Sequence, residues 1–244
     1  MKISVLLPYK ENFASEYAGA VSIFINSINS KSSYKDEITV YGNTKYKKIL
    51  SKNYCNLSLK NKSIIQSNSD FYVNNFIKKK SVINSEIIEI HNRPNYIKKI
   101  LLLKKIKKIL YFHNNPLEMK GSSTIKERLF LINNLDKIIF NSNWTKDQFL
   151  YELPLIYKKI EKLSVIYQST KKNTIDFKKK EKIITFVGKL NAAKGYDLFG
   201  KACIKILKKF SDWRVEVVGD ESREKINFNH PRFNLNGFQN HNFV

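Results

Sequence analysis

The stretch TFVGKLNAAKGYDLFGKACIKILKKF, residues 185–210, places two lysines and two glycines between an apolar run and a helical pattern. Gly188 ends the apolar run, and Lys189 and Lys194 bracket the loop that follows it. A loop that enters a helix N-terminus offers free N–H groups and a partial positive charge, and the lysines add two full charges. The pattern predicts a cradle for phosphates, best matched to a diphosphate. From the spacing alone, an ordinary loop of a lysine-rich protein is an equally good interpretation.

Polar residues also follow other apolar runs. His-Asn-x-Pro occurs at His91–Pro94, with Arg93 inside it, and again at His113–Pro116, while Gly219 belongs to the turn VGDES. Ligands of open α/β sheets bind at the carboxyl ends of the strands, so we expect these groups to share one edge. The loop at residues 188–195 has neither the Walker nor the G-x-G-x-x-G spacing. No cluster of His, Cys and Asp has metal-ligand spacing, so we expect no metal site.

The elements that must position these residues alternate between strand and helix along residues 1–170. Short, uniformly apolar runs separated by helices predict a parallel sheet covered on both faces. The expected strands are Ile3–Leu7, Glu37–Tyr41, Glu86–Ile90, Lys108–Phe112, Lys137–Phe140 and Leu163–Tyr167. The expected helices are Glu16–Ile28, Asn95–Lys107, Ile125–Leu135 and Trp144–Glu152, and residues 43–80 hold one further strand and one helix. Thr124 and Glu127 form a capping-box pattern, and Ser142 or Asn143 caps the helix that follows.

A second and shorter α/β unit follows a linker. Residues 171–182 are polar and lack periodicity, so we predict that they join a first domain, residues 1–170, to a second, residues 183–244. Open doubly wound sheets usually have five or more strands and about 100 residues or more, so we expect the second domain to be incomplete. Its expected elements are strands at Ile183–Val187, Arg214–Val218 and Arg232–Leu235 and a helix at Tyr196–Phe210, whose apolar stripe runs from Leu198 to Phe210.

Composition restricts the class of protein. The chain has 244 residues, 42% of them hydrophobic, which suffices for a core, and a formal net charge of +23. The charge favours an anionic partner, although codon bias in a genome rich in A and T explains it equally well. Cys55 and Cys203 stand in no metal or redox spacing. The apolar start is too short for a signal peptide and no window reaches membrane-span length, so we expect a cytoplasmic location.

On these residues the sequence resembles the retaining glycosyltransferases of family 4, whose GT-B fold has two Rossmann-like α/β domains that face a cleft. GKLNAAKG, residues 188–195, is similar to the family's Gly-Arg, Leu, three variable residues and Lys-Gly. VEVVGD, EIIEIHNRP, ILYFHNNP and LDKIIFNSNWTKDQF resemble other strand ends of the family. Lys189 departs from the family's Arg, keeping the charge but losing the planar fork. The family's later pair of glutamates would lie beyond Val244, so we expect a chain truncated at its C-terminus.

The resemblance implies a role for each of these residues. The donor is a nucleotide sugar, linked to UDP or GDP, and is a substrate rather than a cofactor. Positive charge in the second domain stabilises the departing nucleoside diphosphate, so no metal is required. The implied donor-binding residues are Gly19, Gly188, Lys189, Lys194 and Gly219, the implied catalytic residue that contacts the donor sugar is His113, and the acceptor-binding residues are His91 and Arg93.

The activity that the resemblance implies is the building of a cell-surface glycan, such as lipopolysaccharide, capsule or a glycolipid, with weak or no activity in a truncated chain. Two other classes stay open: a non-catalytic remnant or sugar-nucleotide-binding module, and a nucleic-acid-binding protein, which only the charge favours. The basic and apolar run YIKKILLLKKIKKIL, residues 96–110, predicts either peripheral contact with the anionic inner face of the cell membrane or a helix and strand of the first domain.

Overall fold

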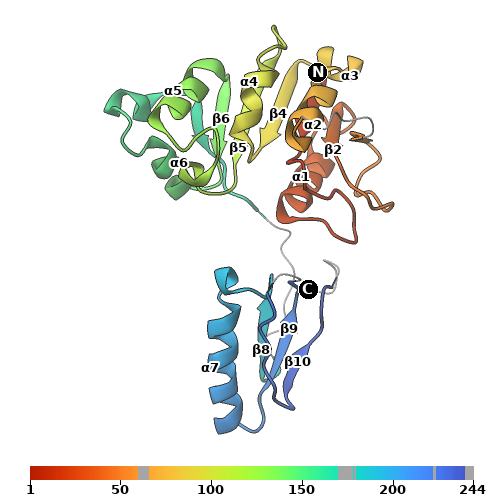
Figure 1. Ribbon diagram of the computed structural model, residues 1–244, viewed down its shortest axis with the longest axis vertical. Coiled ribbons are helices and arrows are strands. Elements are labelled where there is room, and N and C mark those ends of the chain that lie inside the picture. The colour runs from red at the N-terminus through yellow and green to blue at the C-terminus, as the bar shows by residue number, and fades with distance from the viewer. Residues whose placement is uncertain (60–65, 170–177, 179, 222–223, 240–244) are drawn as a thin grey trace. The chain divides into compact units, whose positions relative to one another are not determined.

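The computed structural model describes residues 1–59, 66–169, 178, 180–221 and 224–239. These residues form two compact units, Met1–Thr170 and Lys171–Val244. Each unit has its own parallel sheet (Figure 1). Each also has its own hydrophobic core. Most of the predicted linker lies outside the described residues.

The first unit is built on a seven-stranded sheet in which every neighbouring pair is parallel. The strand order is β3–β2–β1–β4–β5–β6–β7, so the order reverses between β1 and β4. Ligands of such sheets bind outside the carboxyl ends of the strands at this switch point. The strands are β1 Ile3–Leu6, β2 Ile38–Gly42, β3 Tyr54–Asn56, β4 Ile87–His91, β5 Lys107–Phe112, β6 Lys137–Phe140 and β7 Leu163–Val165.

Helices cover both faces of this sheet because side chains alternate along its strands. On one face, Ile25 of α1 packs with Val5 of β1 and with Leu7, which directly follows β1. On the other face, Leu6 joins a larger core that includes residues of α2, α4, α5 and α6. The helices are α1 Ala20–Lys31, α2 Asn68–Ile77, α3 Lys80–Ile83, α4 Ile97–Ile100, α5 Ile125–Asn134 and α6 Asn143–Leu150, with 3-10 turns at Pro94–Tyr96, Pro116–Glu118 and Leu155–Lys159.

The second unit has a three-stranded parallel sheet in the order β10–β9–β8, with one helix along one face (Figure 1). Its core joins Cys203 and Leu207 of the helix to Val215 and Val217 of the central strand. The elements are β8 Ile183–Val187, a 3-10 turn Ala192–Lys194, α7 Tyr196–Lys209, β9 Arg214–Val218 and β10 Phe233–Leu235.

The predicted strands are confirmed to within two residues at each end, and residues 43–80 hold β3 and α2 as expected. The capping box is also confirmed, since Thr124 Oγ1 accepts the N–H of Glu127 at 3.2 Å and Thr124 N–H donates to the Glu127 carboxylate at 3.2 Å. Ser142 caps α6 by accepting the N–H of Thr145. Local hydrogen-bonding patterns were therefore sufficient to locate these helix starts.

The helix predicted at Asn95–Lys107 is wrong in length. Its regular part, α4, ends at Ile100, and the chain turns through Lys105, at φ 63°, before β5 begins. Ile97 and Ile100 are buried, whereas Leu102 is 70% exposed. Because β5 must start beside β4, the residues after Ile100 are used to reverse the chain direction.

The apolar stripe predicted on α7 is also wrong in part. Leu198 is 67% exposed, and the buried row is Tyr196, Gly200, Cys203 and Leu207. A Cβ on Gly200 would overlap the ring of Phe228, so the glycine lets this aromatic side chain pack directly on the helix backbone. The buried face is therefore rotated toward Gly200, a residue that a hydrophobicity pattern does not mark.

The turns that end β8 and β9 meet backbone to backbone. Gly219, at φ 142°, lies so close to Gly188 that a Cβ on it would overlap the carbonyl oxygen of Gly188. Gly219 N–H also donates to Gly237 O at 2.8 Å, which holds it in place. Two of the predicted donor-binding glycines are thus in contact, and their contact fixes the spacing of the two turns.

We expect Gly219→Ala to lower the free energy of unfolding of the second unit by about 2–4 kcal/mol, because the methyl group displaces a carbonyl and the φ angle is strained for alanine. Gly195→Ala is the control, since its φ is 72° but nothing lies within 4 Å of a Cβ there. The control should cost about 1 kcal/mol. Urea unfolding, followed by Trp213 fluorescence in a Trp144→Phe background, measures both. Equal losses would contradict the steric explanation.

Candidate functional site

Four side chains form a column at the carboxyl ends of β4 and β5. Glu89 and His91 are two residues apart on β4, and Tyr111 and His113 are two residues apart on and just beyond β5, so each pair points to one face. His91 lies opposite Tyr111 in the parallel register. Because β4 borders the switch point, the column stands where ligands of open sheets bind.

The two histidines are in direct contact. His91 Nδ1 lies 2.8 Å from His113 Nε2, and the rings are nearly parallel with centroids 5.1 Å apart. On the far side of His91, Nε2 lies 2.6 Å from Glu89 Oε1. On the far side of His113, Nδ1 lies 2.5 Å from Nε2 of Gln168, which follows β7. The structure therefore brings two predicted site residues together in a chain of four polar side chains.

Aromatic rings enclose this chain. Tyr111 stacks on His113 with centroids 4.5 Å apart, and Phe24 of α1 meets the His113 ring edge-on at 5.3 Å. His91 has no exposed surface. Burial and, secondarily, the neighbouring His91 lower the pKa of His113 to about 3. His113 is therefore a neutral imidazole at neutral pH.

Two asparagines clamp the backbone of His113. The Oδ1 of Asn92 accepts its N–H at 2.8 Å, and the Nδ2 of Asn141 donates to its carbonyl at 2.9 Å. Asn92 has a φ of 52°, in the left-handed region that asparagine tolerates better than most residues. Thr145 donates to Asn141 Oδ1 at 2.7 Å, which orients this amide. The peptide groups on both sides of His113 are thus fixed.

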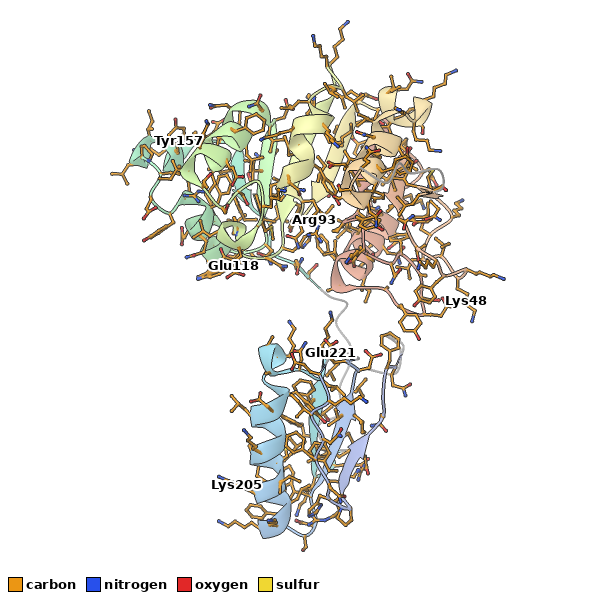
Figure 2. All side chains as sticks on the ribbon, viewed as in Figure 1. Lys48, Arg93, Glu118, Tyr157, Lys205 and Glu221 are labelled. Atoms are coloured by element: carbon orange, nitrogen blue, oxygen red, sulfur yellow. The ribbon has the colours of Figure 1, made fainter. Side chains whose placement is uncertain are left out.

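Arg93 lies at the same edge of the first unit (Figure 2). It lines a cavity there. The cavity has a volume of about 290 Å³, and its charged lining residues are Arg93, Glu118 and Lys120. The Arg93 guanidinium donates to the carbonyl of Asn92 at 2.7 Å, which directs it along the strand end. Arg93 thus lines a cavity, and its contact with an acceptor stays a prediction, whereas the buried His91 has no exposed surface.

Gly19 directly precedes α1, as its N-cap residue. The carboxylate of Glu11 already occupies this helix start, since its Oε1 accepts the N–H of Ser22 at 3.1 Å and a Cβ on Gly19 would overlap it. A donor phosphate at this position would take the place of the Glu11 carboxylate. The assignment of Gly19 to the donor stays a prediction.

Lys189 and Lys194 are both exposed in the loop between β8 and α7. Within the described part of the chain, neither ammonium group has a hydrogen-bond or ion-pair partner. Asn191 organises the turn between them, because its Oδ1 accepts Lys194 N–H at 3.1 Å and its Nδ2 donates to Glu221 at 3.1 Å. The Glu224 carboxylate accepts the N–H of Ala192 at 3.0 Å, so this turn already holds one anionic group.

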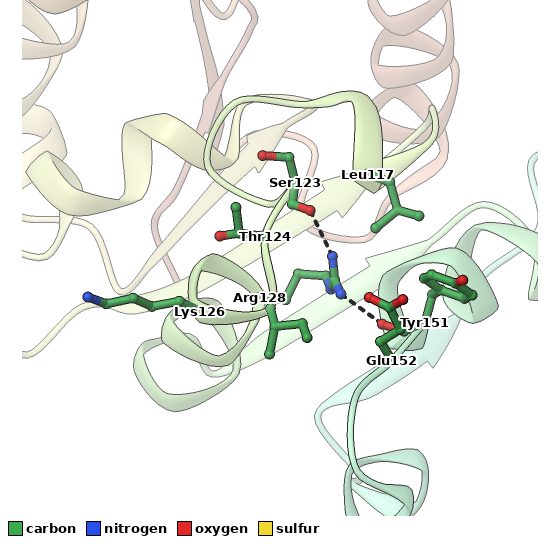
Figure 3. Close-up of a pocket in the computed structure, with 8 residues that line it drawn as sticks. Leu117, Ser123, Thr124, Lys126, Arg128, Tyr151 and Glu152 are labelled. Atoms are coloured by element: carbon green, nitrogen blue, oxygen red, sulfur yellow. Dashed lines mark hydrogen bonds between the residues drawn. The ribbon is translucent and has the colours of Figure 1, made fainter.

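A larger cavity, of about 460 Å³, lies elsewhere in the first unit, between the start of α5 and the end of α6 (Figure 3). Arg128 crosses it, donating to the carbonyls of Ser123 at 3.1 Å and Tyr151 at 2.7 Å (Figure 3). Burial lowers the pKa of this arginine, which is 1% exposed. None of the predicted site residues lines this cavity. Arg128 ties two loops together there.

The described residues contain neither a candidate metal site nor a candidate membrane span. No group of three or more His, Cys, Asp and Glu side chains there is arranged to hold a metal ion. No helix there is long and apolar enough to cross a membrane. Within the run at residues 96–110, Ile97, Ile100 and Ile106 are buried in the first unit, so contact of this run with a bilayer stays a prediction.

The roles of Glu89, Asn92, Asn141 and Gln168 are not predicted from the sequence. A signal existed for Glu89, because it is a charged residue inside the apolar strand of EIIEIHNRP and stands two positions before His91. Asn92 and Asn141 follow strands, but their backbone contacts depend on strand order. Gln168 is distant in sequence from His113, and nothing in the sequence marks their contact.

The comparisons with known proteins concern both units. A model of the family described as glycosyl transferases group 1 matches residues 168–230. No curated protein matched the chain. HepE from Anabaena, solved in complex with UDP-glucose, has a TM-score of 0.67 at 12% identity. The aligned region covers 98% of this chain and 70% of the HepE chain.

Two further solved structures are similar. The lipopolysaccharide outer core galactosyltransferase WaaB has a TM-score of 0.56 at 17% identity, over 98% of this chain and 68% of that chain. A glycosyltransferase from Rickettsia africae has a TM-score of 0.58 at 15% identity, with the same coverage of 98% and 68%. The expected fold class, α/β of the GT-B type, is thereby confirmed. The match of residues 168–230 to the group 1 model and the fold shared with solved glycosyltransferases together support a glycosyltransferase.

We expect His113→Gln to reduce the loss of unfolding free energy that occurs when the pH falls from 7 to 5. The pKa of His113 is about 3 in the folded chain and about 6.5 when unfolded, so below pH 6.5 the unfolded state binds a proton that the folded state does not. Wild-type protein should therefore lose about 2 kcal/mol of unfolding free energy between pH 7 and pH 5 that the variant retains. Urea unfolding at both pH values, followed by Trp144 fluorescence in a Trp213→Phe background, measures the difference. Parallel profiles would show that His113 is not buried as a neutral ring.

Proposed function

We propose that this chain transfers a glycosyl group from a nucleoside diphosphate sugar to a glycan or glycolipid acceptor, with retention and without a metal ion. The observation that carries the proposal is the pair of exposed ammonium groups of Lys189 and Lys194, which have no partner among the described residues and lie in the segment that matches the group 1 family. Two cations in the loop that leads into a helix suit a diphosphate. The similarity of the fold to HepE, solved with UDP-glucose, supports the same ligand class.

Charge explains how the lysines would act. In the proposed reaction the bond between the anomeric carbon and the phosphate oxygen breaks, and negative charge accumulates on the departing diphosphate. A charge pair at about 4 Å is worth about 1 kcal/mol in water and about 4 kcal/mol at an effective dielectric constant of 20. Lys189 and Lys194 would therefore stabilise the departing group most strongly where the ligand excludes water.

The first unit supplies the sugar and acceptor contacts in this proposal. His113, a neutral ring that its backbone clamp holds in place, would contact the donor sugar. The cavity beside Arg93 would take the acceptor, and the guanidinium favours an acceptor with an anionic group. Similarity to the lipopolysaccharide galactosyltransferase WaaB supports a cell-surface glycan as the acceptor class.

The carboxylates of Glu11 and Glu224 support the phosphate assignment indirectly. Glu11 accepts the N–H of Ser22 in the first turn of α1, and Glu224 accepts the N–H of Ala192 in the 3-10 turn that precedes α7. These N–H groups therefore donate to an anionic oxygen in the folded chain. A phosphate oxygen would compete for the same donors with a larger charge.

We expect Lys194→Ala to weaken the binding of UDP-glucose or GDP-mannose about tenfold, the loss of one charge-assisted contact to phosphate. Isothermal titration with UDP, UDP-glucose and GDP-mannose measures the change, and Lys189→Arg should bind at least as tightly as the wild type. Lys205→Ala is the matched control, because this exposed lysine lies further along α7 (Figure 2). Equal effects of Lys194→Ala and Lys205→Ala would remove the phosphate assignment.

Transfer itself requires a separate measurement. The anomeric configuration of the product, followed by NMR, tests retention, and activity that survives EDTA tests metal independence. Binding of a nucleotide sugar without transfer would favour the sugar-nucleotide-binding module. Absence of binding to any sugar nucleotide at millimolar concentration would overturn the proposed function.

A further inference from the structure

One chain of polar contacts runs from Glu89 through both histidines to Gln168. Its contacts are Glu89 Oε1 to His91 Nε2 at 2.6 Å, His91 Nδ1 to His113 Nε2 at 2.8 Å, and His113 Nδ1 to Gln168 Nε2 at 2.5 Å. Each imidazole uses both of its nitrogens. The protons on the two rings can therefore be assigned by starting from Glu89 and from Gln168, the two ends of this series of contacts.

The Gln168 end fixes the proton of His113. The amide nitrogen of Gln168 offers only hydrogens, so His113 Nδ1 must present a lone pair. In a neutral ring the proton then sits on Nε2, which faces His91 Nδ1. His91 Nδ1 must consequently be the acceptor.

The Glu89 end gives the same assignment. His91 Nε2 lacks the alignment of a regular hydrogen bond, but it lies only 2.6 Å from a carboxylate oxygen. Two lone pairs at that distance would repel each other, so Nε2 carries the proton and Nδ1 is free to accept. The contacts at Gln168 and at Glu89 thus give the same assignment independently, and both rings are neutral.

The alternative arrangement places a full charge inside the protein. It needs His91 protonated on both nitrogens, His113 protonated on Nδ1, and the Gln168 amide turned over. His91 has no exposed surface, and an isolated charge in such surroundings is costly, although Glu89 would offset part of the cost. The neutral arrangement needs no buried imidazolium.

We propose that Glu89 and His91 are positioning residues that hold His113 protonated on Nε2, and that the side chain of Gln168 occupies the outward Nδ1 until a ligand replaces it. Glu89 orients His91, His91 accepts the proton of His113, and Nδ1 of His113 is left as a hydrogen-bond acceptor. A group that displaces Gln168 must donate a hydrogen, as a sugar hydroxyl does and an ionised phosphate oxygen does not. The identity of that ligand rests on the proposed function; the proton assignment does not.

The proton assignment is tested on the ligand-free full chain. Long-range ¹H–¹⁵N spectra separate the two ring nitrogens of each histidine, and His113→Gln identifies the signals of His113. We expect an unprotonated Nδ1 and a protonated Nε2 on both rings at neutral pH. A protonated Nδ1 on His113, or two protonated nitrogens on His91, would overturn the proposal even if the chain is an active transferase.

A pair of variants separates positioning from simple packing. His91→Phe keeps a ring but removes the acceptor, so His113 should populate both tautomers and the affinity for UDP-glucose should fall about three- to tenfold, the loss of one hydrogen bond. His91→Asn puts an amide oxygen close to the position of Nδ1 and should restore the Nε2-protonated tautomer and most of the affinity. UDP lacks the sugar, so its affinity should stay the same in both variants. An unchanged tautomer in His91→Phe, or no rescue by His91→Asn, would contradict the role of His91.

Gln168 is tested in the opposite direction. Gln168→Ala removes the competing amide, so we expect UDP-glucose to bind about threefold more tightly while UDP binds equally. Weaker binding of UDP-glucose by this variant would show that Gln168 does not stand in for the ligand. If the wild type binds neither UDP-glucose nor GDP-mannose, the proposed function fails, and the ¹H–¹⁵N spectra still decide the tautomer.

Discussion

Side chains along a β-strand alternate between two faces, and the parallel register of β4 with β5 turns that alternation into a column at the site. Glu89, His91, Tyr111 and His113 meet because each pair is spaced by two residues and because the two strands are neighbours. A shift of register by one residue would send one pair to the opposite face, into the core that contains Phe112. The apolar strands that hold this register therefore determine the geometry of the site.

Most of the fold could be predicted because its signals are local. Short apolar runs gave the strands, and side-chain caps such as Thr124 and Ser142 gave the helix starts. The errors arose where tertiary contacts decide the outcome. Residues after Ile100 turn because β5 must lie beside β4, and the buried face of α7 is centred on Gly200 because Phe228 packs there. Neither contact is encoded in a periodicity.

The candidate site could be predicted only in part, for the same reason. Strand-end positions indicated His91, Arg93 and His113, and loop spacing indicated the two lysines. The roles within the site depend on which strands are adjacent. His91 is fully buried and supports its neighbour rather than presenting a surface, and Gln168 reaches His113 from a segment distant in sequence. The carboxylates of Glu11 and Glu224 at the helix starts were likewise not foreseeable from their distance along the chain.

The grip of Asn92 and Asn141 on the peptide groups of His113 has a consequence for how substitutions in this protein would be interpreted. Because its backbone is held on both sides, the imidazole of His113 can move little to compensate when one of these contacts shifts. Sensitivity to substitution would then spread to the amide side chains that hold this backbone. A map of damaging substitutions would outline the supporting framework as clearly as the reactive ring, and exposure to ligand would be a poor guide to importance.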